Sequence, residues 1–372
     1  MSSFGQLYSD ALEKMVNAKL NQYFDFDKSQ LNCLFTPEEH KVTWDLSEYF
    51  AQYDGLGNKE RISVDALKTL KDLSVKKEYA YALVAPAFLG QFDKSVTPGK
   101  LRNAFKAIGF DGMVEVAVFA DILTLKEALE FDHNILLEED YQLTSCCCPM
   151  WLGMIKKIYN NLMPHVPATV SPMIASGRTV KILHPDSLTV FIGPCVAKKA
   201  EAREPDLKGA IDHVLTFEET VQIFDLLKVK LEDMEDSEKE FSSRAGRIYA
   251  RCGGVSEAVK ATVERLNPTR KIGVRVYSAS GVADCKAMLN ELVEGKTKAN
   301  FFEGMGCIGG CVGGPKSLIN KDEATRHVND YGNQSLYETP IDNPYVVELL
   351  HRLGFDTPES LMEDNKFFTR KF

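Results

Sequence analysis

The sequence lacks any long apolar run. Its longest apolar stretches, 79–89 and 188–194, are far shorter than the roughly 20 residues that a membrane-spanning helix needs. The first ten residues contain no basic region, apolar core or cleavage site of a secretory signal, and no twin arginine. We therefore expect no membrane helix and a cytoplasmic location.

Positive charge is also scarce. The 44 Lys and Arg are outnumbered by 53 Asp and Glu, which gives a formal net charge of -9. Nucleic-acid binding depends on a basic surface that neutralises phosphates, so nucleic acid is not an expected partner. Acidic residues are concentrated in segment 231–240, which we expect to be a solvated loop, with a docking surface as the alternative.

Short β-rich runs alternate with helical patterns through the body of the chain, which is typical of α/β layers. The expected strands are 79–84, 114–119, 180–183, 188–192, 213–216, 273–278 and 300–302. Residues 1–75 have apolar residues at helical spacing and predict a helical N-terminal segment. A central domain is expected at 76–325, and a C-terminal helical segment at 326–372 that includes a helix at 344–353.

Nine cysteines is a high count for a chain expected in a reducing compartment, where clustered thiols indicate metal or redox chemistry more than disulfides. Three segments hold most of them: 144–151 (TSCCCPMW), 193–199 (GPCVAKK) and 301–315 (FFEGMGCIGGCVGGP). The second segment follows the expected strand 188–192, where a strand end can project side chains into a cleft. In the third, a spacing of four places Cys307 and Cys311 on one face if the stretch is helical.

The third segment also has features of a zinc site and of a dinucleotide-binding site. Structural zinc sites usually combine two close cysteine pairs, whereas this chain has one such pair and its other thiols are distant. Gly304, Gly306 and Gly309 match a dinucleotide-binding fingerprint, but two thiols occupy this loop and no strand ending in an acid follows at the required spacing. An iron-sulfur site is favoured because glycine-rich loops expose amide groups to cluster sulfides.

In order and separation, the three segments resemble the signature loops T-S-C-C-P-x-W, M-P-C-x-x-K-x-x-E and E-x-M-x-C-x-G-G-C-x-x-G-G of the [FeFe]-hydrogenase catalytic domain. The resemblance runs from about residue 79 to the C-terminus. It implies a two-lobed α/β fold of mostly parallel sheets flanked by helices, with the active site between the lobes of the 76–325 domain. It also implies an H-cluster, in which Cys148, Cys195, Cys307 and Cys311 bind a [4Fe-4S] cubane and Cys311 bridges to a di-iron unit carrying CO, cyanide and azadithiolate.

The resemblance implies that Cys147 is the proton-relay cysteine. A thiol with an ordinary pKa of about 8.5 is suited to passing protons. Counting from Pro149 makes Cys148 the cluster ligand, whereas counting from Thr144 would make it Cys147; we adopt Pro149 as the anchor. Cys146 is then a surplus thiol. The cysteines outside the motifs, at positions 33, 252 and 285, are expected to be structural.

Further site residues follow from the same resemblance. Glu127 and Glu130, three apart on an expected helix, would be successive stations of the proton route. Lys198 would hydrogen-bond a cyanide ligand, and Met305 would pack near the bridging CO. The cofactor would also be lined by Ala85, Pro86, Gly193 and Pro194.

Four positions depart from the family pattern and alter contacts around the expected cofactor. Pro167 stands where a serine usually joins the two acids, Gly193 replaces the methionine of M-P-C, Met173 replaces a common glutamine, and Ala87 replaces a serine. This pattern is similar to the divergent, sensory branch of the family. Because no C-x-x-C-x-x-C run exists, we expect no accessory clusters and an external electron carrier such as ferredoxin.

The expected function is reversible H2 oxidation and proton reduction in anaerobic hydrogen metabolism, with H2, protons and di-iron maturation proteins as partners. One alternative is an H2-sensing regulatory protein with low turnover. The other is a non-catalytic iron-sulfur protein resembling cytosolic cluster-assembly factors, against which Cys147, Lys198 and Met305 together weigh.

Overall fold

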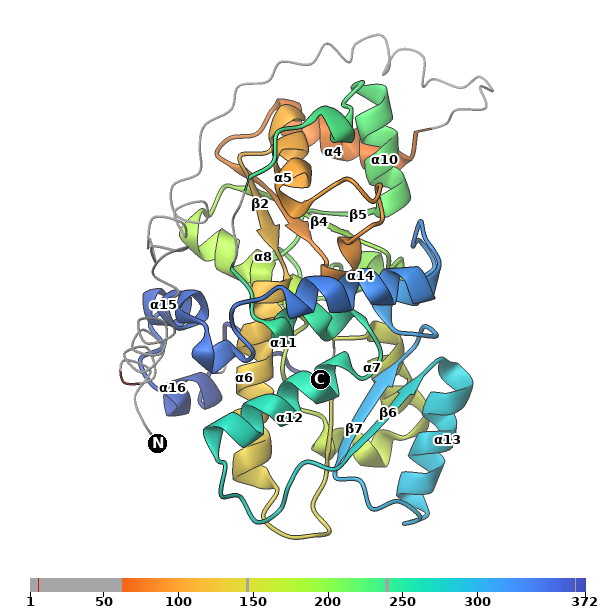
Figure 1. Ribbon diagram of the computed structural model, residues 1–372, viewed down its shortest axis with the longest axis vertical. Helices are drawn as coiled ribbons and strands as arrows, with labels where there is room; N and C mark the ends of the chain where they lie inside the picture. Colours follow the sequence, from red (N-terminus) through yellow and green to blue (C-terminus); the bar gives the residue numbers. More distant parts are fainter. Residues whose placement is uncertain (1–5, 7–61, 145–146, 238–240, 365) are drawn as a thin grey trace.

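Two parallel β-sheets organise the chain. The computed structural model describes residues 6, 62–144, 147–237, 241–364 and 366–372. The first sheet has the order β2-β1-β4-β5, formed by Gly112–Glu115, Ala80–Val84, Leu188–Gly193 and His213–Thr216. The second has the order β3-β7-β6, formed by Gln142–Leu143, Phe301–Met305 and Val276–Ser280. The two sheets lie at different levels along the long axis of the molecule (Figure 1).

The first sheet is covered by helices on both faces, as parallel sheets require. One face packs against α4 (Val64–Ser74), α5 (Pro98–Ala107) and α10 (Phe217–Leu226), which surround it in the upper part of Figure 1. The other face packs against α8 (Pro172–Leu183), and the C-terminal helices α15 (Pro344–Arg352) and α16 (Pro358–Met362) pack on α6 (Ala117–Asn134). The central strand β1 is therefore buried along its whole length.

Helix α6 (Ala117–Asn134) connects the two sheets. It follows β2 directly and runs down the middle of the molecule (Figure 1), and it is buried on nearly every side. Its buried residues are mostly apolar but include the charged side chains of Asp121 and Glu127. It contacts α11 (Arg244–Arg247) and α12 (Gly254–Leu266), so that side chains on α6 reach the region between the sheets.

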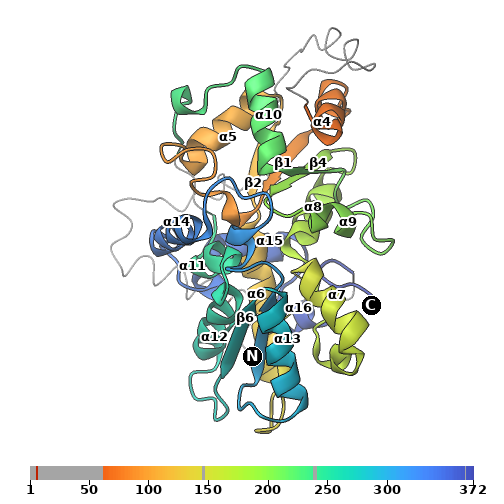
Figure 2. The same cartoon turned by 90° about the vertical axis from the view of Figure 1, so that its right-hand side faces the viewer.

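The second sheet is also sandwiched between helices. In the turned view, α12 and α13 (Val282–Val293) lie on either side of β6 (Figure 2). Helix α7 (Pro149–Ile158) packs on the same side as α13, where its Trp151 lies against Gly304 of β7. The other α-helices of the described residues are α9 (Ala197–Glu201), between β4 and β5 along the chain, and α14 (Lys321–Asn333), which packs on α11.

Most of the expected elements are confirmed, and so is the α/β fold class with parallel sheets flanked by helices. Two expected strands are wrong: 180–183 is the last turn of α8, and the strand expected at 114–119 ends at Glu115, before α6 begins. Segment 231–237 is mostly exposed, as expected, and starts with a short 3-10 helix, Leu231–Asp233; residues 238–240 lie outside the described residues.

The N-terminal segment expected at 1–75 lies mostly outside the described residues, apart from α4. None of the helices in the described part of the chain combines the length and the apolar character that crossing a bilayer would require.

Candidate functional site

A cavity lies where strand ends from both sheets meet. Loops at the carboxyl ends of parallel strands converge on one edge, which is where α/β folds form their sites. Here β1 leads to Ala85 and Pro86, and β4 leads to Pro194 and Cys195, all of which line the cavity. From the second sheet, β3 is followed by Cys147 and Cys148, and β7 by Gly306 and Cys307.

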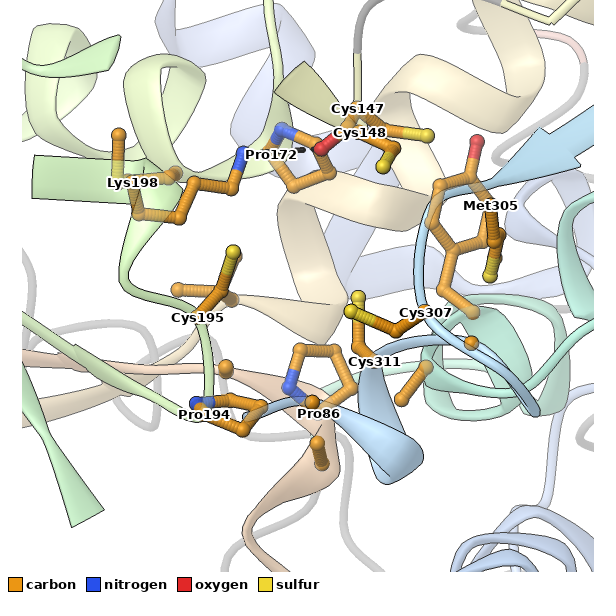
Figure 3. A pocket seen from close by; sticks show the side chains of 18 of the residues that line it. Pro86, Cys147, Cys148, Pro172, Pro194, Cys195, Lys198, Met305, Cys307 and Cys311 are labelled. Carbon is orange, nitrogen blue, oxygen red and sulfur yellow. Dashed lines mark hydrogen bonds between the residues drawn. The ribbon is translucent and has the colours of Figure 1, made fainter. Parts of the chain in front are cut away.

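The four expected ligands Cys148, Cys195, Cys307 and Cys311 all line this cavity, and Figure 3 shows them arriving from three separate segments. Cys148 stands immediately before α7, whose first residue is Pro149, and its Sγ accepts a hydrogen bond from the Gly306 amide at 3.3 Å. Proline is favoured at this first helical position because its missing N–H would have no partner there. The helix start therefore fixes where Cys148 points.

A glycine-rich loop, not a helix, carries Cys307 and Cys311. Gly309 and Gly310 have φ angles of +87° and +94°, which few other residues adopt. A Cβ at Gly310 would lie 2.7 Å from the Met305 Sδ, so glycine is also needed for close packing. The helical face suggested for this pair is thus wrong, since only Cys311–Gly313 forms a short 3-10 turn. The loop itself turns both thiols to the cavity.

Burial and mutual repulsion raise the pKa of Cys307 and of Cys311. Burial raises the pKa of Cys307 to about 11, and the neighbouring charges of Cys195 and Cys148 add to the shift. Cys311 is shifted in the same direction, by burial and then by Cys195 and Cys148. Thiols in such surroundings stay protonated until a cation replaces the protons. The donor set therefore fits a metal-containing group.

The arrangement does not fit a single metal ion. Among the described residues, no three His, Cys, Asp or Glu side chains converge as ligands of one ion would. The four thiols instead surround a large cavity whose other walls are mainly apolar, including Phe191, Met305 and several alanines and prolines. A cluster of several metal ions suits this spacing better than zinc does.

Lys198 lines the cavity, but its ammonium group is held by protein atoms. Its Nζ donates to Glu201 Oε2 at 2.6 Å and to the Cys147 carbonyl at 2.9 Å. Although burial lowers the pKa of Lys198, the Glu201 charge raises it above its ordinary value, so the lysine stays charged. Glu201 was not singled out from the sequence, although a glutamate three residues after the lysine belongs to the quoted M-P-C-x-x-K-x-x-E loop.

Cys147 precedes the expected ligand Cys148 and packs against the group of buried apolar side chains that contains Met305 and Tyr249. Burial, followed by the charge of Glu127, raises the pKa of Cys147 well above its ordinary value. The thiol is therefore more firmly protonated than an ordinary pKa would imply. The preceding Cys146 lies outside the described residues.

The two expected relay acids both lie on α6, behind the cavity wall. Glu127 is completely buried, whereas the Glu130 side chain is 20% exposed and lies 3.3 Å from Lys126 Nζ. Burial raises the pKa of Glu130, against the effect of Lys126. The two acids thus lie in order from the interior to the surface, although neither lines the cavity.

The other expected site residues differ in their placement. Ala87 and Met173 join Ala85, Pro86 and Pro194 in the cavity wall, but Gly193 does not. Sequence reasoning missed Phe191 and Tyr249, which do line it. Outside the motifs, Cys285 is buried, as expected of a structural thiol. Cys252 is partly exposed, and its amide donates to the Gly309 carbonyl of the glycine-rich loop. Cys33 lies outside the described residues.

The model of the family described as "Iron only hydrogenase large subunit, C-terminal domain" matches residues 78–315, which is more than half of the chain. The chain belongs to this family. The four expected cysteine ligands and the two expected relay acids fall within the matched residues. The iron-sulfur character expected of the site agrees with this membership.

The relatives of this iron-only hydrogenase family member include proteins named as hydrogenases and a protein named as an iron-sulfur assembly component. The chain is 26% identical to iron hydrogenase 1 of Clostridium pasteurianum, over 71% of this chain and 55% of that protein. It is 27% identical to the periplasmic [Fe] hydrogenase large subunit of Nitratidesulfovibrio vulgaris, over 66% of this chain and 70% of that one. It is also 24% identical to cytosolic iron-sulfur assembly component 3 of Pongo abelii, over 70% of this chain and 66% of that protein.

Solved structures show the same fold. The [FeFe]-hydrogenase HydA1 from Chlamydomonas reinhardtii superposes with a TM-score of 0.62 at 20% identity, covering 79% of this chain and 95% of that one. This likeness confirms the expected two-lobed fold of the family. The identities are low throughout, as in a divergent branch.

Proposed function

We propose that this chain is the catalytic domain of an [FeFe]-hydrogenase, which interconverts H2 with protons and electrons at an H-cluster. The observation that carries the proposal is that Cys148, Cys195, Cys307 and Cys311, drawn from three distant segments, line one cavity. In this proposal they hold the [4Fe-4S] cubane, and Cys311 is shared with the di-iron unit. When bound, the cofactor supplies the reversible splitting of H2 and takes up the electrons.

The chain's own residues would bind, shield and supply protons. Cys147 would exchange protons with the cofactor, and Glu127 and Glu130 would carry them toward the surface along α6. Lys198 would place a fixed positive charge beside the anionic cofactor, because Glu201 keeps it protonated and in place. The apolar residues Ala85, Pro86, Pro194 and Met305 would exclude water from the site.

The proposal includes the partners of such an enzyme. Without a second iron-sulfur motif, the cubane would exchange electrons directly with an external carrier such as ferredoxin. Di-iron maturation proteins would deliver the second unit. We place this activity in the cytoplasm of an anaerobic cell, without a nucleic-acid or membrane partner.

Two alternatives have support of their own. An H2 sensor with low turnover is favoured by the altered positions Pro167, Met173, Gly193 and Ala87, because such neighbours tune a cofactor without removing it. A non-catalytic iron-sulfur protein is favoured by the similarity to the assembly component from Pongo abelii.

Infrared spectroscopy tests the proposal. The purified chain would be reconstituted with iron and sulfide and then matured with the di-iron cofactor. We expect CO and cyanide bands in the wild type and none in a Cys311→Ser control, which lacks the shared thiolate. A wild type without these bands would leave only the non-catalytic alternative. If the bands appear, turnover assays with a reduced electron donor decide between the enzyme and the sensor.

A further inference from the structure

A buried lysine joins the outer relay acid to the C-terminal helix. Lys126 lies on α6, one residue before Glu127, and its side chain is 2% exposed. Its Nζ donates to the Leu361 carbonyl at 3.0 Å and to the Met362 carbonyl at 3.3 Å, and it lies 3.3 Å from Glu130 Oε1. Lysine is almost never buried this completely without paired groups around its charge. The ammonium group therefore has a specific place between α6 and α16, which lie side by side (Figure 1).

The two carbonyls that bind Lys126 stand at the end of α16. The last carbonyls of a helix have no intrahelical partner and carry a partial negative charge, which a cation can satisfy. The segment after α16 is itself attached to the rest of the chain, since the Val170 amide donates to the Phe368 carbonyl at 2.8 Å. Helix α16 is thus a fixed anchor, and Lys126 connects it to α6.

Glu130 needs a compensating charge where it lies. It is one helical turn after Lys126, so the two side chains share a face of α6. Its Oε2 is shielded from solvent and has no hydrogen-bond partner among the described residues. A carboxylate with a desolvated oxygen is costly unless a cation lies beside it, and Lys126 is that cation. Burial raises the pKa of Glu130, whereas the Lys126 charge lowers it, so the lysine favours the ionised acid.

Other charged groups on α6 and on the helices packed against it are bound elsewhere. His133, three residues after Glu130, lies 2.9 Å from Asn134 Oδ1, and Asp132 pairs with Arg270. Arginines of α8, α11, α12 and α15 bind acids or main-chain carbonyls: Arg178 the Thr369 carbonyl, Arg247 the Tyr331 carbonyl, Arg244 Glu257, Arg265 Asp342 and Arg352 Glu348. Among the described residues, the Lys126 charge is the one that shifts the pKa of Glu130.

We propose that Lys126 is a positioning residue of the proton route, which holds the Glu130 carboxylate at the outer end of the route and ties it to α16. Glu130 takes up one proton on its carboxylate and releases one to solvent, where its side chain is 20% exposed, so that no proton is consumed. Lys126 keeps its own protons throughout. This inference rests on the proposed function and deepens it, because it names the group that prepares the outer acid to exchange protons.

Infrared titration of the protein without the di-iron unit tests the ion pair directly. The carboxyl band of protonated Glu130 is assigned by its loss in Glu130→Gln. We expect the titration midpoint of this band to rise by about 1–3 pH units in Lys126→Met, because an adjacent cation lowers the pKa of a carboxyl group by about that amount. Lys126→Arg keeps the charge and should stay close to the wild type. An unchanged midpoint in Lys126→Met would overturn the inference.

Two further variants keep this test decisive. If Lys126→Met does not fold, Lys126→Gln replaces it, since the amide group can still donate to α16 but carries no charge; the same rise is expected, and a wild-type midpoint would refute the role. Lys181→Met is the matched control. Lys181 Nζ also donates to a carboxylate, Asp212 Oδ2 at 2.7 Å, and to a carbonyl, that of Ser187, but beside the first sheet. An equal rise in this control would count against a specific effect of Lys126.

The pH profile of the matured protein provides the second test. During H2 oxidation Glu130 has to be ionised to accept the outgoing proton, so the acidic limb of the rate should move upward in Lys126→Met and return in Lys126→Arg. A merely structural role would lower the rate at every pH without moving this limb, and that result would refute the proposal. If the wild type never shows the CO and cyanide bands, the proposed function fails, and the infrared titration still decides whether Lys126 controls Glu130.

Discussion

Replacing Lys198 tests both the stability of the site and its ability to hold the cofactor. Lys198→Met removes the partner of Glu201, whose side chain is 1% exposed and whose carboxylate lies 2.6 Å from Lys198 Nζ. Removing one member of a buried ion pair leaves an uncompensated charge and costs about 3–5 kcal/mol. We expect a loss of this size in the free energy of unfolding, measured by urea titration of the protein without the di-iron unit.

The double variant Lys198→Met/Glu201→Leu isolates the cause. It removes both charges, so most of the lost stability should return. A remaining deficit of about 1–3 kcal/mol is expected, because the Cys147 carbonyl loses the hydrogen bond that Lys198 Nζ donates at 2.9 Å. Lys199→Met is the comparison: its partners Asp65 and Glu219 are more exposed than Glu201, so the loss of stability should be smaller than in Lys198→Met.

The same double variant separates folding from cofactor binding. If it is as unstable as Lys198→Met, the buried pair is not the source of the stability and the electrostatic reasoning fails. If it is stable, di-iron loading can be compared with the wild type by infrared intensity. We expect reduced loading, because the positive charge beside the anionic cofactor is gone; normal loading would remove the role assigned to Lys198.

Three further predictions concern other parts of the site and its support. Cys147→Ala should lower H2 production by a factor of about 100 or more while the CO and cyanide bands stay, and undiminished turnover would show that protons travel elsewhere. Burial raises the pKa of Asp121 to about 7, against donors from Ser243 and Gly246. Because the pKa of Asp121 is higher in the folded than in the unfolded protein, the wild-type free energy of unfolding should fall by up to about 4 kcal/mol between pH 4 and 7. In urea titrations, Asp121→Asn should show a weaker dependence of this free energy on pH. Gly304→Ala should cost about 1–3 kcal/mol or more in thermal unfolding, because the new Cβ would lie 2.0 Å from Trp151.

Local pattern was enough to predict the strands that lead to the site. Strand β4 is a short run of apolar and β-branched residues. It ends at Gly193, one residue after the end that the sequence predicts. The wrong strand at 180–183 has the same composition, but it belongs to α8, which begins after Ser171 with Pro172 at its first position. Serine followed by proline is a helix-start signal, so the start of this helix could have been read from the sequence.

Contacts between distant segments could not be predicted from spacing. The spacing of four in Cys307 and Cys311 suggested a helix, yet the positive φ angles of Gly309 and Gly310 make the chain turn instead. Tyr249 follows no motif, and its place in the cavity wall depends on how α11 and α12 pack on α6. The family motifs predict which thiols gather in the cavity, whereas the groups behind its wall emerge only from the packing.

The departure from the family pattern at Gly193 is linked to the packing of its neighbours in and beside the cavity wall. Gly193 and Phe191 lie on the same face of β4, because they are two residues apart. A Cβ at Gly193 would lie 3.0 Å from the Phe191 ring and 3.0 Å from the Ala85 Cβ, so this space is already filled. Phe191 lines the cavity in place of a side chain at position 193. Restoring the family methionine at position 193 alone would therefore overpack this part of the wall.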